Sequence, residues 1–437
     1  MNSLFCRISS LSFATALTCL VALVSPDAAA AAAVGLTYQD VGIGIGNSRE
    51  LRGIRLNWSD SRVRRVDGIN LTAWRPGSND RFEMNGVALG IVGPSVGRLH
   101  GLGIGLIGSS ADESHGIVIG GLGVAGGRMS GIQLAGLGLA ADSHVRGIQA
   151  AGLGLAVDGD LEGISVAGLG LAADGGAKGI LLAGLGMGID GDVTGISAAG
   201  LGMGLDGDLK GISVAGLGLG VDGDLTGVVV SGIGAGIGGD VRGVTISGIG
   251  AGVDGDAYGI HAAGVGLGID GTSRGLSVAG IGMGADEEMI GIQLAGLGMG
   301  AGAGIRGLSF AGGVIGSPKL TGIQVGGIGL VATDEARGLQ VGGVGVLGKS
   351  LVGWNAGGLV VGALDLRGVA TSIGHVRVER MHGFAASAYN RIDIADGLMI
   401  GLVNWTESLR GVQIGLVNYV GDNPTGAKLL PIVNARF

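Results

Sequence analysis

Residues 211–226 read GISVAGLGLGVDGDLT, and near-copies of this stretch follow one another along the chain. Each copy opens on a glycine, and from residue 131 these glycines recur every 16 residues without a break. The series is Gly131, Gly147, Gly163, Gly179, Gly195, Gly211, Gly227, Gly243, Gly259, Gly275, Gly291 and Gly307. Tandem copies at a fixed period predict a repeat architecture in which each copy is one structural unit.

The composition excludes several other classes of protein. Of 437 residues, 100 are glycine and 6 are proline, with 46% hydrophobic and 14% charged residues, whereas ordinary globular chains have about 7% glycine and about 25% charged residues. Collagen is excluded because proline is scarce and glycine does not recur at every third position. The apolar character argues against disorder, which leaves an ordered, glycine-rich repeat protein.

Within one copy the apolar residues alternate as they do in β-strands. Ile212 and Val214 share one parity, whereas Leu217 and Leu219 share the other. If all four side chains face one core, a corner or a bulge is expected between the two pairs. The DGD sequence near the end of the copy favours a turn.

The fold class is therefore all-β, and three architectures are considered. The favoured one is a β-solenoid with one coil per copy, in which the large aliphatics of both strands fill the core while glycine, alanine and serine face outward. The alternatives are an antiparallel outer-membrane β-barrel and a ring of repeated β-hairpins. High apolar content and the ending LLPIVNARF favour the barrel. Consecutive copies are alike, however, and a barrel repeats every two strands and carries aromatic girdles.

Four segments are expected along the chain. They are a signal peptide at 1–33, an N-terminal β region or cap at 34–85, the tandem glycine-rich array at 86–367, and a C-terminal repeat or cap region at 368–437. Aromatic residues gather on both sides of the array, where they are predicted to close the ends of the core, with ligand binding as the alternative.

The first segment has the pattern of an export signal. A single positive charge, Arg7, precedes an apolar stretch, and an alanine-rich run follows it. This pattern predicts cleavage and export. Cys6 and Cys19 are the only two cysteines and both lie in this segment, so the mature chain is expected to have no thiols.

The C-terminal units differ from the array. They read GLMIGLVNWTESLR at 397–410 and GVQIGLVNYVGDN at 411–423. This part, within residues 381–437, resembles bacterial surface-repeat proteins with tandem GLQIGLVN-type units; the central array has glycine or alanine in place of the asparagine. The resemblance implies a signal-bearing envelope or surface protein with no established chemistry. The asparagines carried over are predicted to bond backbone groups or to form a ladder between strands, with a ligand role as the alternative: Asn390, Asn404, Asn418 and Asn434.

No catalytic or cofactor-binding residue is predicted, and the chain is expected not to be an enzyme. The six histidines lack the spacing of metal ligands. Serines such as Ser165, Ser197 and Ser213 occupy one repeated strand position, which is interpreted as a small outward residue rather than an activated nucleophile.

The aspartates of the DGD turn are the remaining candidates for a metal site. Because the same turn recurs in each copy, stacking would align these carboxylates in columns. The predicted role is a solvated turn, neutralised by nearby basic residues such as Lys210 and Arg242. The alternative is structural calcium, which takes carboxylate and carbonyl oxygens. Its candidate ligands are Asp206, Asp208, Asp222 and Asp224.

Residues 343–350, GVGVLGKS, match the phosphate-binding loop pattern. The two glycines of the match also belong to the repeat, and Lys349 and Ser350 are expected at its usual turn. A phosphate loop needs a helix directly after it. The glycine-rich stretch that follows argues against such a helix, so nucleotide binding is not predicted.

The function predicted from the sequence is a non-enzymatic, exported bacterial envelope or cell-surface repeat protein with a structural or interaction role. The alternative is an outer-membrane β-barrel or pore. The expected location is the outer membrane, the cell surface or the periplasm, with an unknown surface or envelope partner and possible outer-membrane association. Nucleic-acid binding is not expected, because the net charge is -8 and the one basic cluster, Arg62, Arg64 and Arg65, has acidic neighbours.

Overall fold

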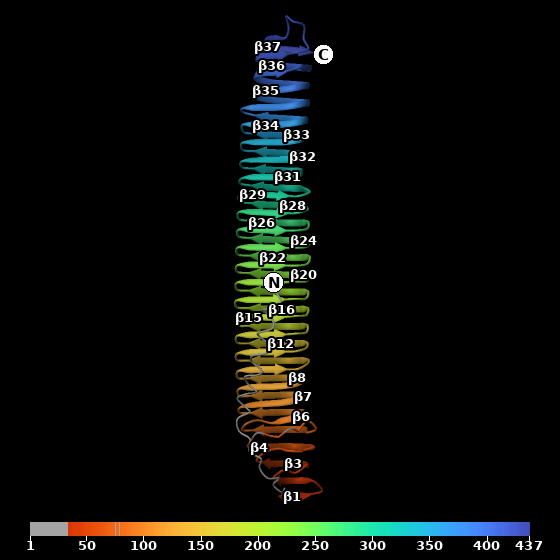
Figure 1. The fold of residues 1–437 in the computed structure, drawn as a ribbon, viewed down its shortest axis with the longest axis vertical. Coiled ribbons are helices and arrows are strands. Elements are labelled where there is room, and N and C mark those ends of the chain that lie inside the picture. Colours follow the sequence, from red (N-terminus) through yellow and green to blue (C-terminus); the bar gives the residue numbers. More distant parts are fainter. Residues whose placement is uncertain (1–33, 75, 78) are drawn as a thin grey trace. The chain divides into compact units, whose positions relative to one another are not determined.

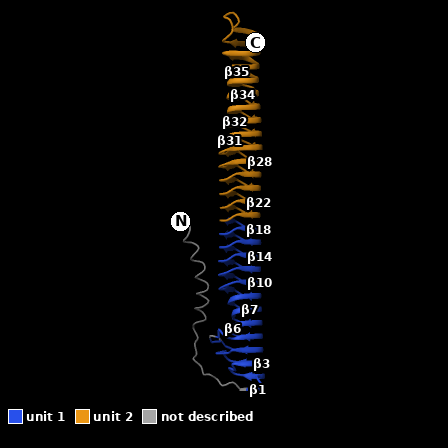
Figure 2. Ribbon diagram, turned by 90° about the vertical axis from the view of Figure 1, so that its right-hand side faces the viewer, with its two compact units in different colours: residues 1–221 blue, residues 222–437 orange. Residues whose placement is uncertain are grey.

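The computed structural model describes residues 34–74, 76–77 and 79–437, and every helix or strand in this part of the chain is a β-strand. None of the described segments forms a helix of the length and hydropathy needed to cross a membrane. The chain divides into unit 1, up to Val221, and unit 2, from Asp222 (Figure 2). The predicted signal peptide, with Cys6 and Cys19, lies outside the described residues.

Unit 1 holds the first nineteen strands, several of which are labelled in Figure 1. They are β1 (Val34–Tyr38), β2 (Val41–Ile45), β3 (Glu50–Asn57), β4 (Arg65–Thr72), β5 (Glu83–Gly90), β6 (Ser95–Gly105), β7 (Gly108–Gly120), β8 (Gly123–Ala135), β9 (Gly138–Ala141), β10 (Val145–Ala151), β11 (Gly154–Val157), β12 (Leu161–Ala167), β13 (Gly170–Ala173), β14 (Ala177–Ala183), β15 (Gly186–Ile189), β16 (Val193–Ala199), β17 (Gly202–Leu205), β18 (Leu209–Ala215) and β19 (Gly218–Val221).

Unit 2 begins with the same alternation of long and short strands and ends with longer ones. They are β20 (Leu225–Ser231), β21 (Gly234–Ile237), β22 (Val241–Ser247), β23 (Gly250–Val253), β24 (Ala257–Ala263), β25 (Gly266–Ile269), β26 (Ser273–Ala279), β27 (Gly282–Ala285), β28 (Glu288–Ala295), β29 (Gly298–Ala301), β30 (Gly304–Ala311), β31 (Val314–Gly326), β32 (Gly329–Gly342), β33 (Gly345–Gly357), β34 (Val360–Ser372), β35 (His375–Thr406), β36 (Ser408–Val420) and β37 (Leu429–Arg436).

Consecutive copies pair in parallel and in register. In unit 1, β16 pairs with β18, which places Gly195 opposite Gly211 and Ile196 opposite Ile212. The short strands β17 and β19 pair in the same way. One copy is therefore one coil, made of a long and a short strand, and the coils stack through backbone hydrogen bonds. This is the predicted β-solenoid; the parallel register differs from that of both antiparallel alternatives.

The first and the last strands pair differently from the rest. β1 runs antiparallel to β2 at the start of unit 1, and β37 runs antiparallel to β36 at the end of unit 2. The coils also shorten toward the C-terminus, where Gly397 lies opposite Gly411, a step of 14 residues. The change of strand direction ends the parallel ladder at these two places.

The core is composed differently from the sequence prediction. In the coil of β18 and β19, Leu209, Leu219 and Val221 are buried as expected, but so are Ser213 and Ala215. Ile212 and Val214 face outward and are 45% and 42% exposed. The expectation that the large aliphatics of both strands fill the core is therefore wrong for Ile212 and Val214 on the long strand, and also for Leu217 at the corner, which is 46% exposed.

The predicted parity change is wrong for the same reason. Inward residues keep one parity through the coil, from Leu209 to Ser213 and Ala215 and on to Leu219. The two strands of a coil face each other across the core, as the contact of 3.5 Å between Ser197 Oγ of β16 and Met203 Sδ of β17 in the preceding coil illustrates. In this coil the long strand contributes Leu209, Ser213 and Ala215 to the core, and in another coil the position of Ser213 is occupied by Leu181, which is also buried.

Candidate functional site

The outward side chains of the long strands form an apolar surface in each unit, which we call the aliphatic face. Register places equivalent side chains of successive coils in columns, such as Ile196 beside Ile212. A leucine at the corner between the long and short strands, such as Leu217 at 46% exposure, adds a further column. Contiguous exposed aliphatic columns are unusual on a protein surface and indicate a contact surface.

From β10 to β19, the members of this face in unit 1 are Ile148, Ile164, Val166, Ile180, Leu182, Ile196, Ile212 and Val214 on the strands, with Leu169, Leu185, Leu201 and Leu217 at the corner. Those in unit 2 are Ile246, Ile260, Ile292, Leu294, Leu308, Phe310 and Ile323 on the strands, with Ile233, Ile249, Val265, Ile281, Leu297, Ile328, Val344 and Leu359 at the corner.

The short strands present a second surface of different chemistry, which we call the glycine face. Their outward positions in β15, β17 and β19 are glycines, including Gly188, Gly204 and Gly220. A methyl group placed on any of these three would meet no atom within 4 Å. The prediction that small residues face outward therefore holds for these glycines of the short strands, but not for Ser213 and Ala215 of the long strand, which face the core.

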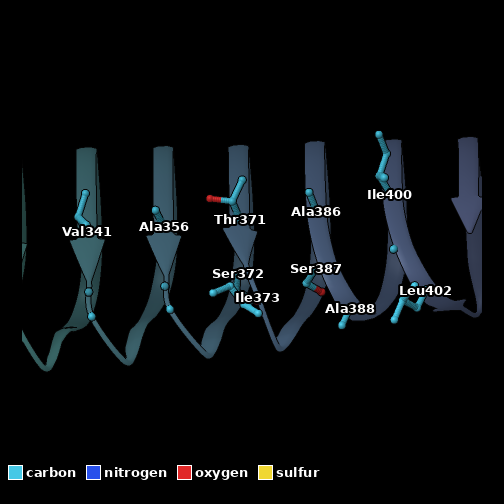
Figure 3. A pocket seen from close by; sticks show the side chains of 15 residues that line it. Val341, Ala356, Thr371, Ser372, Ile373, Ala386, Ser387, Ala388, Ile400 and Leu402 are labelled. Carbon is cyan, nitrogen blue, oxygen red and sulfur yellow. The ribbon is translucent and has the colours of Figure 1, made fainter.

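Shallow grooves lie beside the column of outward side chains that includes Leu134 and Val166. They follow the corner glycines between the long and short strands. In unit 1 one groove is lined by Leu134, Ala151 and Val166 together with corner glycines such as Gly136 and Gly152. A larger groove of about 840 Å³ lies in unit 2. Figure 3 shows its strand side chains and, nearer the turns, Ile373, Ala388 and Leu402. Both grooves follow the stacking direction because each coil adds the same wall.

Where a turn has an aspartate at its first position, as at Asp158, Asp174, Asp190 and Asp206, the carboxylates of successive coils form a column of like charges. Partial burial raises the pKa of Asp190, and the neighbouring Asp206 and Asp174 raise it further. The pKa of Asp158 is raised in the same way, first by partial burial and then by the neighbouring Asp174 and Asp142. These side chains are exposed, which agrees with the predicted solvated turn.

The second aspartate of the turn bonds to the backbone of the next coil. The Asp208 N–H donates to Oδ1 of Asp192 at 2.9 Å in unit 1. In unit 2 the Asp240 N–H donates to Oδ1 of Asp224 at 2.8 Å, and the Asp256 N–H to Oδ1 of Asp240 at 3.0 Å. This carboxylate therefore links successive turns, a structural role that the sequence pattern did not reveal.

The calcium candidates divide between the two positions of the turn. Asp206 and Asp222 are exposed first-position residues, whereas Asp208 and Asp224 occupy the linking position. Asp208 Oδ2 also lies 3.8 Å from Lys210 Nζ. Among the described residues, no three or more histidine, cysteine, aspartate or glutamate side chains come together in a group that could hold a metal ion.

The serines of the long strands face the core, which corrects their interpretation as outward residues. Ser165, Ser197 and Ser213 have no exposed surface. Ser197 and Ser213 bond through their hydroxyl groups in neighbouring coils. In unit 2 the equivalent strand position is occupied by His261, which is fully buried and whose two ring nitrogens have no hydrogen-bond partner. Burial lowers the pKa of His261 to about 4.

The C-terminal asparagines form the ladder that was predicted as one of two structural roles. Asn390 Nδ2 donates to Oδ1 of Asn404 at 2.7 Å, and Asn404 Nδ2 donates to Oδ1 of Asn418 at 2.7 Å. The Asn404 and Asn390 amides also donate to backbone carbonyls of the next coil. Asn434 lies in β37, and its Nδ2 donates to the Asn418 carbonyl at 3.3 Å. All four side chains are buried.

A buried ionic network that no sequence motif indicates lies near the start of unit 1. Arg55 is fully buried and pairs with Asp60. Arg55 Nη1 also donates to Oδ1 of Asn70 at 2.9 Å, and Thr72 Oγ1 donates to Oδ2 of Asp60 at 2.6 Å. Buried charges are retained when paired and hydrogen-bonded. An arginine five residues before an aspartate carries no distinctive pattern, so no sequence signal marked this pair.

The residues of the basic cluster and most of the described aromatic residues lie on the surface. Arg62, Arg64 and Arg65 are exposed. The aromatics were predicted to close the core, and Phe82 does lie inside it. Trp58, however, is exposed and stacks on Trp74 with ring centroids 6.1 Å apart.

The phosphate-loop match at residues 343–350 is not followed by a helix. Lys349 and Ser350 lie within strand β33, and Ser350 pairs with Glu335 and Asp365 of the neighbouring coils. The expected turn at this place is wrong, because here the coil continues as one strand with a register shift between Ala332 and Glu335. A phosphate loop requires a helix N-terminus, so the match belongs to the repeat pattern.

Comparisons with known protein families, characterised proteins and solved structures found no match for this chain.

Proposed function

We propose that this chain is an exported structural or interaction protein of a bacterial envelope or cell surface, acting through the aliphatic face rather than through a catalytic pocket. The observation that carries the proposal is the repetition of that face over many coils of each unit. A repeated unit multiplies weak contacts along one surface, which is how solenoid proteins bind extended partners. The repeat solenoid itself is consistent with a structural protein.

Two sequence features support the export part of the proposal. Residues 1–33 have the signal-peptide pattern, and residues 381–437 resemble bacterial surface-repeat units. The linking aspartates and the asparagine ladder have structural partners, so these polar groups need no substrate to account for them.

Cell fractionation tests the proposal. The chain is expressed in a bacterial host, the cytoplasm and the envelope are separated, and the N-terminus is read by mass spectrometry. We expect a product shortened within residues 28–33 and located in the envelope or at the surface. A matched variant, L17R/L20R, breaks the apolar stretch of the predicted signal and should stay cytoplasmic. Full-length, cytoplasmic wild-type chain would contradict export.

A further inference from the structure

We propose that the aliphatic face of unit 1 binds a second copy of this chain, so that two solenoids pack sheet against sheet. The inference rests on the proposed function, because it identifies the partner of the interaction surface. It concerns the side chains that the long strands turn outward, such as Ile164, Ile180 and Ile196.

The available area is sufficient for a stable dimer. The twelve aliphatic side chains of this face in unit 1 are each between 37% and 46% exposed. At roughly 75 Å² per side chain they offer about 900 Å², compared with about 800 Å² per partner in a standard protein interface. Unit 2 carries a face of the same chemistry. An apolar centre of this size is typical of permanent rather than transient contacts.

The repeat distance of the aliphatic face favours a second copy of this chain as the partner. The aliphatic columns rise by one strand spacing per coil, about 4.8 Å, and the groove beside them repeats with the same step because each coil adds one wall. A ridge of side chains fits a groove along its whole length only if both have the same step. A second copy has that step, and its ridges and grooves lie on the same face.

The charges that border this face also suit a self-complementary contact. Arg146, Glu162, Lys178 and, beyond Thr194, Lys210 occupy one column next to the isoleucines, so both signs are present. Arg146 Nη2 lies 2.7 Å from Glu162 Oε2. In a two-fold interface the same patch meets itself, which requires both signs within the patch. The apolar centre with a mixed-charge border meets this requirement.

The glycine face is the natural control surface. Gly188, Gly204 and Gly220 present no side chain there, and added side chains would meet open space. The face therefore has little apolar side-chain area to bury, and substitutions on it should leave a dimer built on the other face intact. Threonine is suitable at both surfaces because it is a good strand residue.

The test measures the mass of the full chain by analytical ultracentrifugation over a concentration series. We expect a dimer for the wild type and for G188T/G204T/G220T. For I164T/I180T/I196T we expect the dimer dissociation constant to rise at least about a hundredfold, because six isoleucines leave the interface. Circular dichroism and melting curves of the three proteins establish that all are folded.

Three outcomes would overturn the inference: a wild type that is monomeric throughout the series, an isoleucine variant that dimerises as tightly as the wild type, or a monomer that binds phosphatidylcholine vesicles through the isoleucines. The last outcome would assign the face to a lipid surface. A monomeric chain that is nevertheless exported to the envelope would contradict only this inference, whereas a cytoplasmic dimer would contradict only the proposed function.

Discussion

At the scale of single residues, glycines of the same coil have opposite tolerance to substitution. A methyl group on Gly200 would lie 2.0 Å from the Gly184 carbonyl oxygen of the preceding coil, whereas one on Gly204 would meet nothing within 4 Å. We expect G200A to lower the free energy of unfolding by about 1–3 kcal/mol or more, because backbone must move. G204A should be neutral or stabilising by up to about 1 kcal/mol, because it restricts the unfolded chain.

Urea unfolding of the two variants beside the wild type measures this difference. Alanine already stands at the position equivalent to Gly204 in another coil, at Ala156, which provides a natural precedent. Equal losses of stability in both variants would contradict the close stacking of the corner glycines.

The two aspartates of one turn should respond in opposite directions. Partial burial and the neighbouring carboxylates raise the pKa of Asp190, so its charge disfavours the folded state at neutral pH. This penalty is fully present above the raised pKa and is relieved as pH falls through it. D190N should therefore stabilise slightly at pH 7, by no more than a few tenths of a kcal/mol for an exposed group.

D192A should instead destabilise, by about 1 kcal/mol, since it removes the acceptor for the Asp208 N–H. Thermal melting at low ionic strength, with both variants measured side by side, tests the opposite signs. Loss of stability in D190N, or a neutral D192A, would show that the two positions of the turn are equivalent.

His261 introduces a dependence of stability on pH. Its folded-state pKa of about 4 lies below the ordinary value of 6.5. Between these two pKa values the imidazole is protonated in the unfolded chain but neutral in the folded chain. The free energy of unfolding therefore decreases as pH drops from 6.5 toward about 4, and above this window His261 does not affect it. H261S should remove up to roughly 3 kcal/mol of this loss.

The measurement is the free energy of unfolding from pH 7 to pH 4 for the wild type and H261S. T245S serves as a control, since Thr245 is the residue opposite His261 in the neighbouring strand and does not titrate. Parallel pH profiles for H261S and the wild type would contradict the burial of a neutral imidazole.

At the scale of strands, the asparagine ladder holds the C-terminal coils of unit 2 together. Asn404 is bonded on both sides, to Asn390 and to Asn418. N404A should cost about 2–4 kcal/mol, because buried amide groups on both neighbours lose a partner. The double variant N390A/N404A should cost less than the sum of the single variants, because the shared bond is lost once.

Denaturant unfolding of the single and double variants measures this coupling. S387A is a useful comparison, because the Ser387 hydroxyl bonds Asn390 from the side of the ladder, at 2.9 Å. Strict additivity of N390A and N404A would show that the asparagines act independently.

At the scale of the whole molecule, stability is built from contacts between adjacent coils. Backbone pairing, turn carboxylates and core columns all join a coil to its immediate neighbours. Such arrays behave approximately as sums of repeat and interface terms. The acidic turns already have partners in backbone amides and basic side chains, for example Asp240 with Arg242.

We therefore expect calcium to be dispensable. A chelator such as EDTA should leave the melting temperature unchanged, and added calcium should not raise it beyond the effect of an equal ionic strength of sodium chloride. Scanning calorimetry with the two salts matched makes the comparison. A calcium-specific increase would restore the candidate ligands Asp206, Asp208, Asp222 and Asp224 as a binding column.

The repeat period and the strand-like alternation predicted an all-β repeat fold and favoured a β-solenoid over a barrel or a ring of hairpins. The parallel pairing in register, seen only in the structure, decided among the three. The ladder role of Asn404 was also within reach, since identical side chains at one position of stacked strands must lie beside each other. Both are consequences of local repetition.

The tertiary structure decided which side of each strand faces the core. Alternation is compatible with either parity, and hydrophobicity alone favoured Ile212 inside. In the folded coil the other parity faces the core, so Ser213 and Ala215 lie on the same inner side as Leu219 while Ile212 and Val214 are exposed. The pairing of Arg55 with Asp60 was equally beyond the sequence. Inward or outward placement depends on the space between two facing strands, which exists only once the coil has closed.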